Sequence, residues 1–118
     1  MSADLSRGSG RIQVSPAAIT SIVSTAVLQC YGVVGIAARH TRHGQALILK
    51  EDQYERGIAV SFEGGRVTVD VYVIVEYGTR ISEVGQNIIT TVGSAIRRSL
   101  GSTPIHINVN VQGLRISA

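Results

Sequence analysis

Apolar and polar residues alternate with a period of two along several segments, which predicts strands. The clearest case spans residues 66–76, where valine occupies every second position from Val67 to Val75. Alternation over 58–62 and 105–112 predicts two more strands, and Gly64-Gly65 suits the tight turn of a hairpin. A shorter alternation over 10–14 predicts a first strand. Because each buried valine stabilises by about 1.5–3 kcal/mol, the strand with five valines is expected to lie centrally.

Two other segments have apolar residues three and four positions apart, which predicts amphipathic helices. The first follows Ser15-Pro16, where the serine can cap free N–H groups and the proline suits the first helical position. The second is expected to begin with Ser82 as its cap and to end at Gly101. A short helical turn is also expected over 45–53. The apolar stripes are Ile19, Ile22, Val23, Ala26, Val27 and Cys30 in the first helix, and Val84, Ile88, Ile89, Val92, Ala95 and Ile96 in the second.

These elements follow one another in the order β-α-β-β-α-β. Both helices have one apolar stripe and the strands have one apolar face, so the economical arrangement has two layers. The sequence therefore predicts an α+β, two-layer sandwich with two helices on one face of a mixed sheet. Residues 11–118 are expected to form a single domain, and residues 1–10 a flexible N-terminal tail. The order of the strands within the sheet stays open.

Composition narrows the class of protein. The 118 residues are 44% hydrophobic and 16% charged, which is typical of a globular domain. No apolar stretch reaches the roughly 20 residues that a membrane span needs, and the first ten residues lack the apolar segment of a signal peptide. Cytoplasmic residence without a direct membrane span is therefore predicted. The formal net charge of +3 permits an anionic partner without requiring one.

Catalytic chemistry finds little support in the chain. It contains neither a G-x-S-x-G turn nor a phosphate-binding G-x-x-x-x-G-K-[ST] loop. Its one cysteine, Cys30, continues an apolar helical stripe and is interpreted as a packing residue. His40 and His43 could approach one another if their segment were helical, but Gly44 favours a loop. We predict a protein that is not an enzyme, with no metal and no cofactor.

A basic loop is the most distinctive surface feature. Arginine donates paired hydrogen bonds to phosphate, so this loop could contact RNA, DNA or lipid headgroups; the alternative is a solvated loop. The outward face of the sheet could also carry RNA, but Tyr72 is its one large aromatic residue and Asp70 would repel phosphate. The candidate anion or partner contacts are Arg39, His40, Arg42 and His43.

The predicted helix exteriors are unusual because they carry small, uncharged polar side chains in place of Lys and Glu. Such residues allow another surface to approach without the desolvation of charges. Two interpretations stay open: a plain surface of low charge, or a contact surface for a second copy or another partner. The candidate self-association residues are Ser21, Ser24, Thr25, Asn87, Thr90, Thr91 and Ser94.

Four pieces of the chain, taken in order, resemble the bacterial alkaline shock (envelope stress response) protein family. They are residues 12–16, 32–37, 67–78 and 108–113, with the sequences IQVSP, GVVGIA, VTVDVYVIVEYG and NVNVQG. The resemblance implies a non-enzymatic cytosolic protein connected with envelope or alkaline stress, in some members held at the membrane by a separate anchor protein. Other members have a genomic context that suggests lipid metabolism. No catalytic residues carry over, and the basic loop departs from the family pattern.

Together these observations predict an interaction or scaffold protein of envelope stress physiology. It would act through self-association as a homo-oligomer and through protein partners, with a membrane-anchored protein as one such partner. The alternative function is a nucleic-acid-binding regulator that uses the basic loop, residues 39–43.

Overall fold

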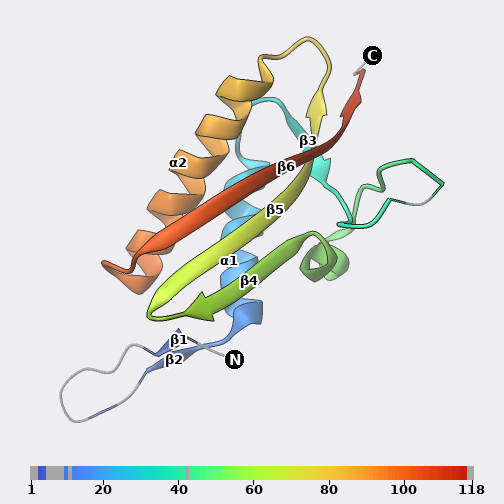
Figure 1. Ribbon diagram of the computed structural model, residues 1–118. Helices are drawn as coiled ribbons and strands as arrows, with labels where there is room; N and C mark the ends of the chain where they lie inside the picture. The colour runs from blue at the N-terminus through green and yellow to red at the C-terminus, as the bar shows by residue number, and fades with distance from the viewer. Residues whose placement is uncertain (1–2, 5–9, 11, 42, 117–118) are drawn as a thin grey trace.

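The computed structural model describes residues 3–4, 10, 12–41 and 43–116, and shows two helices packed side by side on one sheet (Figure 1). Most of the tail predicted over 1–10 therefore lies outside the described residues. The elements are β1 (Ala3–Asp4), β2 (Gln13–Val14), α1 (Pro16–Leu28), β3 (Val33–Ile36), the 3₁₀ helix η1 (Glu51–Arg56), β4 (Ile58–Glu63), β5 (Arg66–Glu76), α2 (Ile81–Leu100) and β6 (Ile105–Arg115).

Strand β5 is the centre of the sheet, as its five valines predicted. On one side its first half pairs antiparallel with β4 and its second half pairs antiparallel with β3. On the other side it pairs in parallel with β6 along its whole length, so the sheet is mixed. Val71 lies opposite Ile58 on one side and Val109 on the other.

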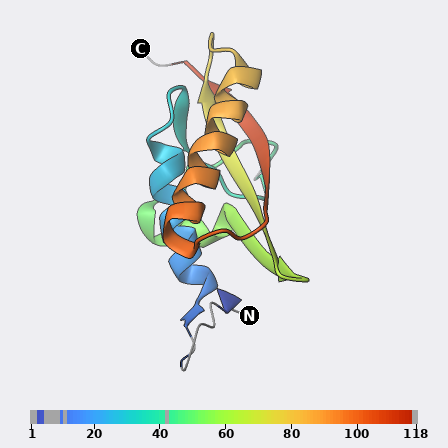
Figure 2. The ribbon, with the colours of Figure 1, turned by 90° about the vertical axis from the view of Figure 1, so that its left-hand side faces the viewer.

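The core lies between the sheet and the two helices, which cover the same face (Figure 2). Every valine of the β5 row is at most 2% exposed, and Ile19, Val23, Ile88 and Val92 face this row from the helices with no exposed surface. The apolar stripes and the apolar strand face thus bury one another, which confirms the predicted α+β class.

The first predicted strand differs from expectation. β2 pairs with β1 and not with the main sheet, and Ile12 is 57% exposed instead of facing the core. An additional strand, β3, supplies the fourth member of the main sheet. The reason is length: β4 pairs only with residues 66–71 of the longer β5, so the later half of β5 has a free edge that the apolar run of β3 fills.

Local expectations had mixed outcomes. Ser15 caps α1 by accepting a hydrogen bond from the Ala18 amide at 3.2 Å, as predicted. Ser82 is not the cap of α2, because the helix begins one residue before it, with Arg80 as the capping residue. The short helix expected over 45–53 forms further along, as η1.

Ile74 is buried although it belongs to the outward face of β5, with 1% of its surface exposed. In register it lies between Gly35 and Gly113 of the neighbouring strands. A Cβ added at Gly35 would lie 3.0 Å from Ile48, and a Cβ added at Gly113 would lie 3.4 Å from Ala46. The segment that follows β3 therefore folds back across the sheet and closes this end of its outward face.

Candidate interaction surface

The outer side of the two helices, which we call the helical face, is formed by small uncharged residues. α1 contains no ionisable side chain in its 13 residues. Ser21 and Thr25 are exposed on α1, as are Asn87, Thr90 and Ser94 on α2, as the sequence predicted. Thr91 is half-buried. Ser24 departs from expectation, because it is only 6% exposed and lies on the side of α1 that faces η1.

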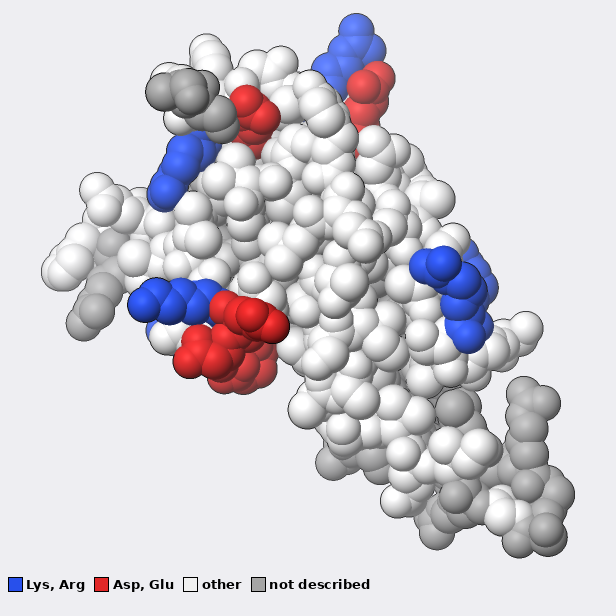
Figure 3. Space-filling view, turned by 180° about the vertical axis from the view of Figure 1, so that it is seen from behind, with Lys and Arg blue, Asp and Glu red and all other residues white. Residues whose placement is uncertain are grey.

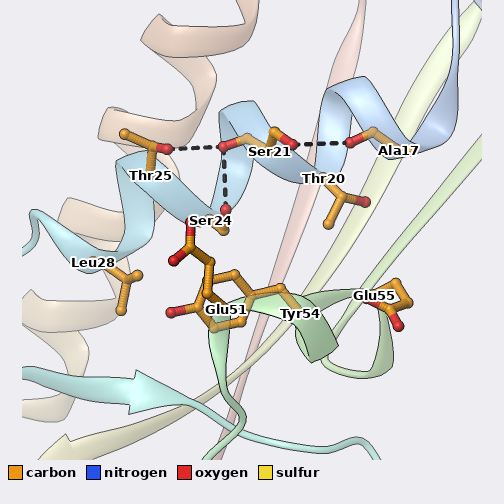
Figure 4. A pocket seen from close by; sticks show the side chains of 9 residues that line it. All are labelled: Ala17, Thr20, Ser21, Ser24, Thr25, Leu28, Glu51, Tyr54 and Glu55. Carbon is orange, nitrogen blue, oxygen red and sulfur yellow. Dashed lines mark hydrogen bonds between the residues drawn. The ribbon is translucent and has the colours of Figure 1, made fainter.

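The hydroxyl groups of Ser21, Ser24 and Thr25 donate to the backbone of their own helix, α1 (Figure 4). Ser21 Oγ donates to the Ala17 carbonyl at 3.3 Å, and Ser24 Oγ and Thr25 Oγ1 both donate to the Ser21 carbonyl, at 3.1 and 2.9 Å. Since these donors already have partners, a covering surface need not replace hydrogen bonds to water for them. Dehydrating the outside of α1 therefore costs little free energy.

Two hollows lie at opposite sides of the helical face. The first, of about 580 Å³, separates α1 from η1, and Glu51, Tyr54 and Glu55 form its far wall (Figure 4). The second, of about 500 Å³, lies beside the end of α2 and is lined by Thr90, Thr91, Ser94, Arg97 and Arg98. Both combine hydroxyl groups with charges, but the first has only acidic charged residues and the second only basic ones.

Acidic and basic side chains adjoin at the top of this side of the molecule, but lower down they lie at two opposite edges (Figure 3). Acidic side chains gather over η1 at one edge, with a basic side chain next to them, and basic side chains gather over the end of α2 at the opposite edge. The surface between the two edges is uncharged. We call Glu51 and Glu55 the acidic edge, and Arg97 and Arg98 the basic edge. Among the described residues neither edge has an ion-pair partner.

The sequence did not single out either edge as functional. Glu51 and Glu55 belong to a mostly charged run over residues 50–56, which indicates an exposed segment but not what lies beside it. Their position beside α1 depends on how the long segment after β3 returns to the sheet, and local periodicity does not encode that path. Arg97 and Arg98 lie in the last turn of α2, where basic residues are common because they complement the helix dipole.

The basic loop is exposed at Arg39, His40 and His43, whereas Arg42 lies outside the described residues. The structure adds Arg56, which sequence reasoning missed. The Arg39 amide donates to the Arg56 carbonyl at 3.0 Å, and Arg39, His40, Glu55 and Arg56 line a shallow hollow of about 320 Å³. Gln112 Nε2 also donates to the Arg39 carbonyl at 2.9 Å, which ties the start of the loop to β6.

Other candidate sites gain little from the structure. Asp70 accepts a hydrogen bond from Asn108 Nδ2 at 2.8 Å, so these two polar groups of the outward sheet face satisfy one another. Cys30 is half-buried, with Sγ 3.4 Å from the Ala26 carbonyl oxygen. Within the described ranges, no three His, Cys, Asp or Glu residues form a metal-binding group, and no helix is long and apolar enough to cross a membrane.

Comparison with known proteins agrees with this picture of a small α+β domain. The alkaline shock protein 23 family, which has a cell envelope-related function, matches residues 4–116. The uncharacterized protein YloU of Bacillus subtilis (strain 168) is 36% identical over 118 residues, covering 99% of this chain and 98% of the relative. The uncharacterized protein Spy1614 of Streptococcus pyogenes serotype M6 is 30% identical, covering 98% and 97%.

The chain therefore belongs to this cell envelope-related, alkaline shock protein family, which confirms the resemblance noted in its sequence. Solved structures of a domain called MamM CTD share the fold. One variant, H285A, has a TM-score of 0.55 and 16% identity, covering 84% of this chain and 98% of that domain. At this identity the similarity concerns the fold alone.

Proposed function

We propose that this protein is a non-enzymatic interaction protein that self-associates through the helical face and acts with protein partners in cell-envelope physiology. The observation that carries the proposal is the uncharged exterior of α1 and of the middle of α2, with the Ser21 and Thr25 hydroxyl donors already bonded within α1. A solvated helix normally carries Lys and Glu on its outer side, and their absence reduces the free energy needed to cover this surface.

The helical face is large enough for an interface of moderate strength. The 20 residues of α2 span about 30 Å, the 13 residues of α1 span about 20 Å, and each helix is about 10 Å wide. The face therefore offers about 500 Å² per copy, compared with about 800 Å² per partner in a standard stable interface. We expect self-association that can be measured at micromolar concentration.

Placing two charges on the helical face should dissociate the assembly. In Thr90→Glu with Ser94→Glu, the like charges of two copies would be dehydrated against uncharged surface, so we expect the dissociation constant to rise at least about 100-fold. Sedimentation velocity over a concentration series measures this, and circular dichroism checks the fold. Thr41→Glu with Ser102→Glu changes the net charge equally at exposed positions outside both helices and should leave association unchanged. A wild-type protein that sediments as a monomer contradicts the proposal.

The alternative function, nucleic-acid binding, is favoured by one observation: Arg56 joins Arg39 and His40 at the basic loop. If this cluster binds phosphates, Arg39→Ala with Arg56→Ala should weaken binding of mixed RNA and DNA about 10-fold and reduce its salt dependence. Filter binding at low salt measures both effects. The matched control is Arg66→Ala with Arg115→Ala, which removes two exposed arginines elsewhere. Lack of any retention of nucleic acid by the wild type would eliminate this alternative.

Membership of a cell envelope-related family also suggests how the protein reaches its place of action. A cytoplasmic member would be brought to the envelope by a membrane-anchored protein partner, as the family resemblance implies. Crosslinking in native cells, followed by separation of captured protein, RNA and lipid, would identify the class of partner.

A further inference from the structure

The acidic and basic edges lie on opposite sides of the helical face, and this arrangement is self-complementary (Figure 3). A two-fold axis that lies in the interface and runs along the helices places each side of the face against the other side of the second copy. The acidic edge of each copy then meets the basic edge of its partner, and this favourable contact occurs twice. Direct stacking of like charges is avoided.

The register of the two helices supports the same arrangement. α1 and α2 run antiparallel, and Cys30 Sγ lies 3.9 Å from the Asn87 carbonyl oxygen at one end of the pair (Figure 1). Counting back along both helices at the same rise per residue, Thr25 is level with about residue 92 of α2. Ser21 and Thr25 of one copy would therefore meet the uncharged stretch of α2 around Thr90 and Ser94 in the other.

The same counting places the charged groups level with one another. Glu55 lies beside the first turns of α1, near Ala17 and Thr20, whereas Glu51 lies nearer Leu28 (Figure 4). Thr20 is level with about residue 97 of α2. Glu55 is thus at the height of Arg97 and Arg98 and would face them across the two-fold axis.

We propose that this protein forms a two-fold symmetric dimer through its helical face, in which Glu55 pairs with Arg97 and Arg98 of the second copy and fixes the register, while Glu51 adds negative charge to the same edge. This inference rests on the proposed function, because it assumes self-association through the same face. It adds the identity of the partner, the symmetry and the charged residues that align the two copies. Peripheral charge pairs of this kind set orientation and specificity more than total affinity.

Charge reversal tests the pairing. One variant carries Arg97→Glu and Arg98→Glu, and a second carries Glu51→Lys and Glu55→Lys. Each alone opposes like charges at both edges, so we expect its homodimer dissociation constant to rise at least about 10-fold. The two variants mixed together should form a heterodimer with roughly wild-type affinity, because one variant is acidic at both edges and the other is basic at both, so each contact again joins opposite charges. The fourfold variant with both changes should dimerise with itself, since its acidic and basic edges have simply exchanged places.

Analytical ultracentrifugation with one variant fluorescently labelled measures these species, after circular dichroism has shown that each variant is folded. Arg66→Glu with Arg115→Glu is the matched control, since it changes the net charge as much as the arginine reversal does but outside the helical face. This control should dimerise normally. Wild-type association should also weaken with added salt, as exposed charge pairs are screened.

These experiments distinguish failure of the paired edges from failure of the proposed function. A monomeric wild type overturns both the dimer and the proposed function. A wild-type dimer that Thr90→Glu with Ser94→Glu dissociates, but that charge reversal leaves unchanged, overturns the paired edges while the proposed function survives. Recovery in the mixture as particles larger than dimers would overturn the two-fold symmetry, because head-to-tail contacts between the same edges propagate into chains.

Discussion

Val71→Asp is expected to unfold the domain. Val71 has no exposed surface and lies in the middle of β5, with paired strands on both sides and the helices above it. A carboxylate at this position would be dehydrated without a cation to pair with, which costs about 4–5 kcal/mol or more. That loss is comparable with the whole stability of a small domain, about 5–15 kcal/mol. Thermal and urea unfolding followed by circular dichroism should show a greatly weakened or absent cooperative transition.

The control for this substitution is Thr68→Asp, in the same strand but on its outward face. Thr68 is half-buried and lies opposite His106 of β6, so a carboxylate there keeps contact with water and faces a group that can carry positive charge. We expect it to lower stability by about 1 kcal/mol or less. Equal effects of the two substitutions would contradict the assignment of Val71 to the core.

Gly57→Ala should be the second most damaging of the proposed substitutions, although it adds one methyl group. A Cβ at Gly57 would overlap the Ala37 carbonyl oxygen and lie 2.8 Å from Ile36 Cγ2. The residue cannot shift easily, because its amide donates to the Tyr54 carbonyl and its carbonyl accepts from the Tyr72 amide. Overpacking against the backbone and a buried side chain is expected to cost about 3 kcal/mol, equivalent to about 10 °C in melting temperature.

The matched control is Gly85→Ala within α2. An added Cβ there meets no atom within 4 Å, and alanine has the higher helix propensity. We therefore expect this variant to be about 0.5–1 kcal/mol more stable than the wild type. A differential scanning measurement of both glycine variants compares them directly. Gly57→Ala melting at the wild-type temperature would show that β3 and the start of β4 are further apart than described.

The contrast between these glycines illustrates which features could be predicted. Gly57 appears in the sequence as one of 13 glycines, and the distant residues that crowd it cannot be deduced from local pattern. Ile74 is similar, because its burial depends on Gly35 and Gly113 and on the segment that packs beside them. In both cases the constraint arises where distant segments of the chain meet.

The candidate interaction surface divides in the same way. Its uncharged residues could be named from helical periodicity, which assigned Ser21, Thr25, Thr90 and Ser94 to the outer sides of their helices. Ser24 was misplaced because periodicity does not reveal what flanks a helix, and η1 covers that side of α1. The acidic edge could not be predicted for the same reason.

Local sequence was sufficient to establish the two helices, the long strands, their buried faces and the family to which the chain belongs. The elements depend on interactions between residues a few positions apart, so their pattern can be read directly along the chain. Three-dimensional packing was needed to establish that β3 completes the sheet, that Arg56 lies beside Arg39, and that acidic and basic edges flank one uncharged face. Those contacts join segments separated by long stretches of chain, and the position of β3 follows from the unequal lengths of β4 and β5, which leave an open edge beside the second half of β5.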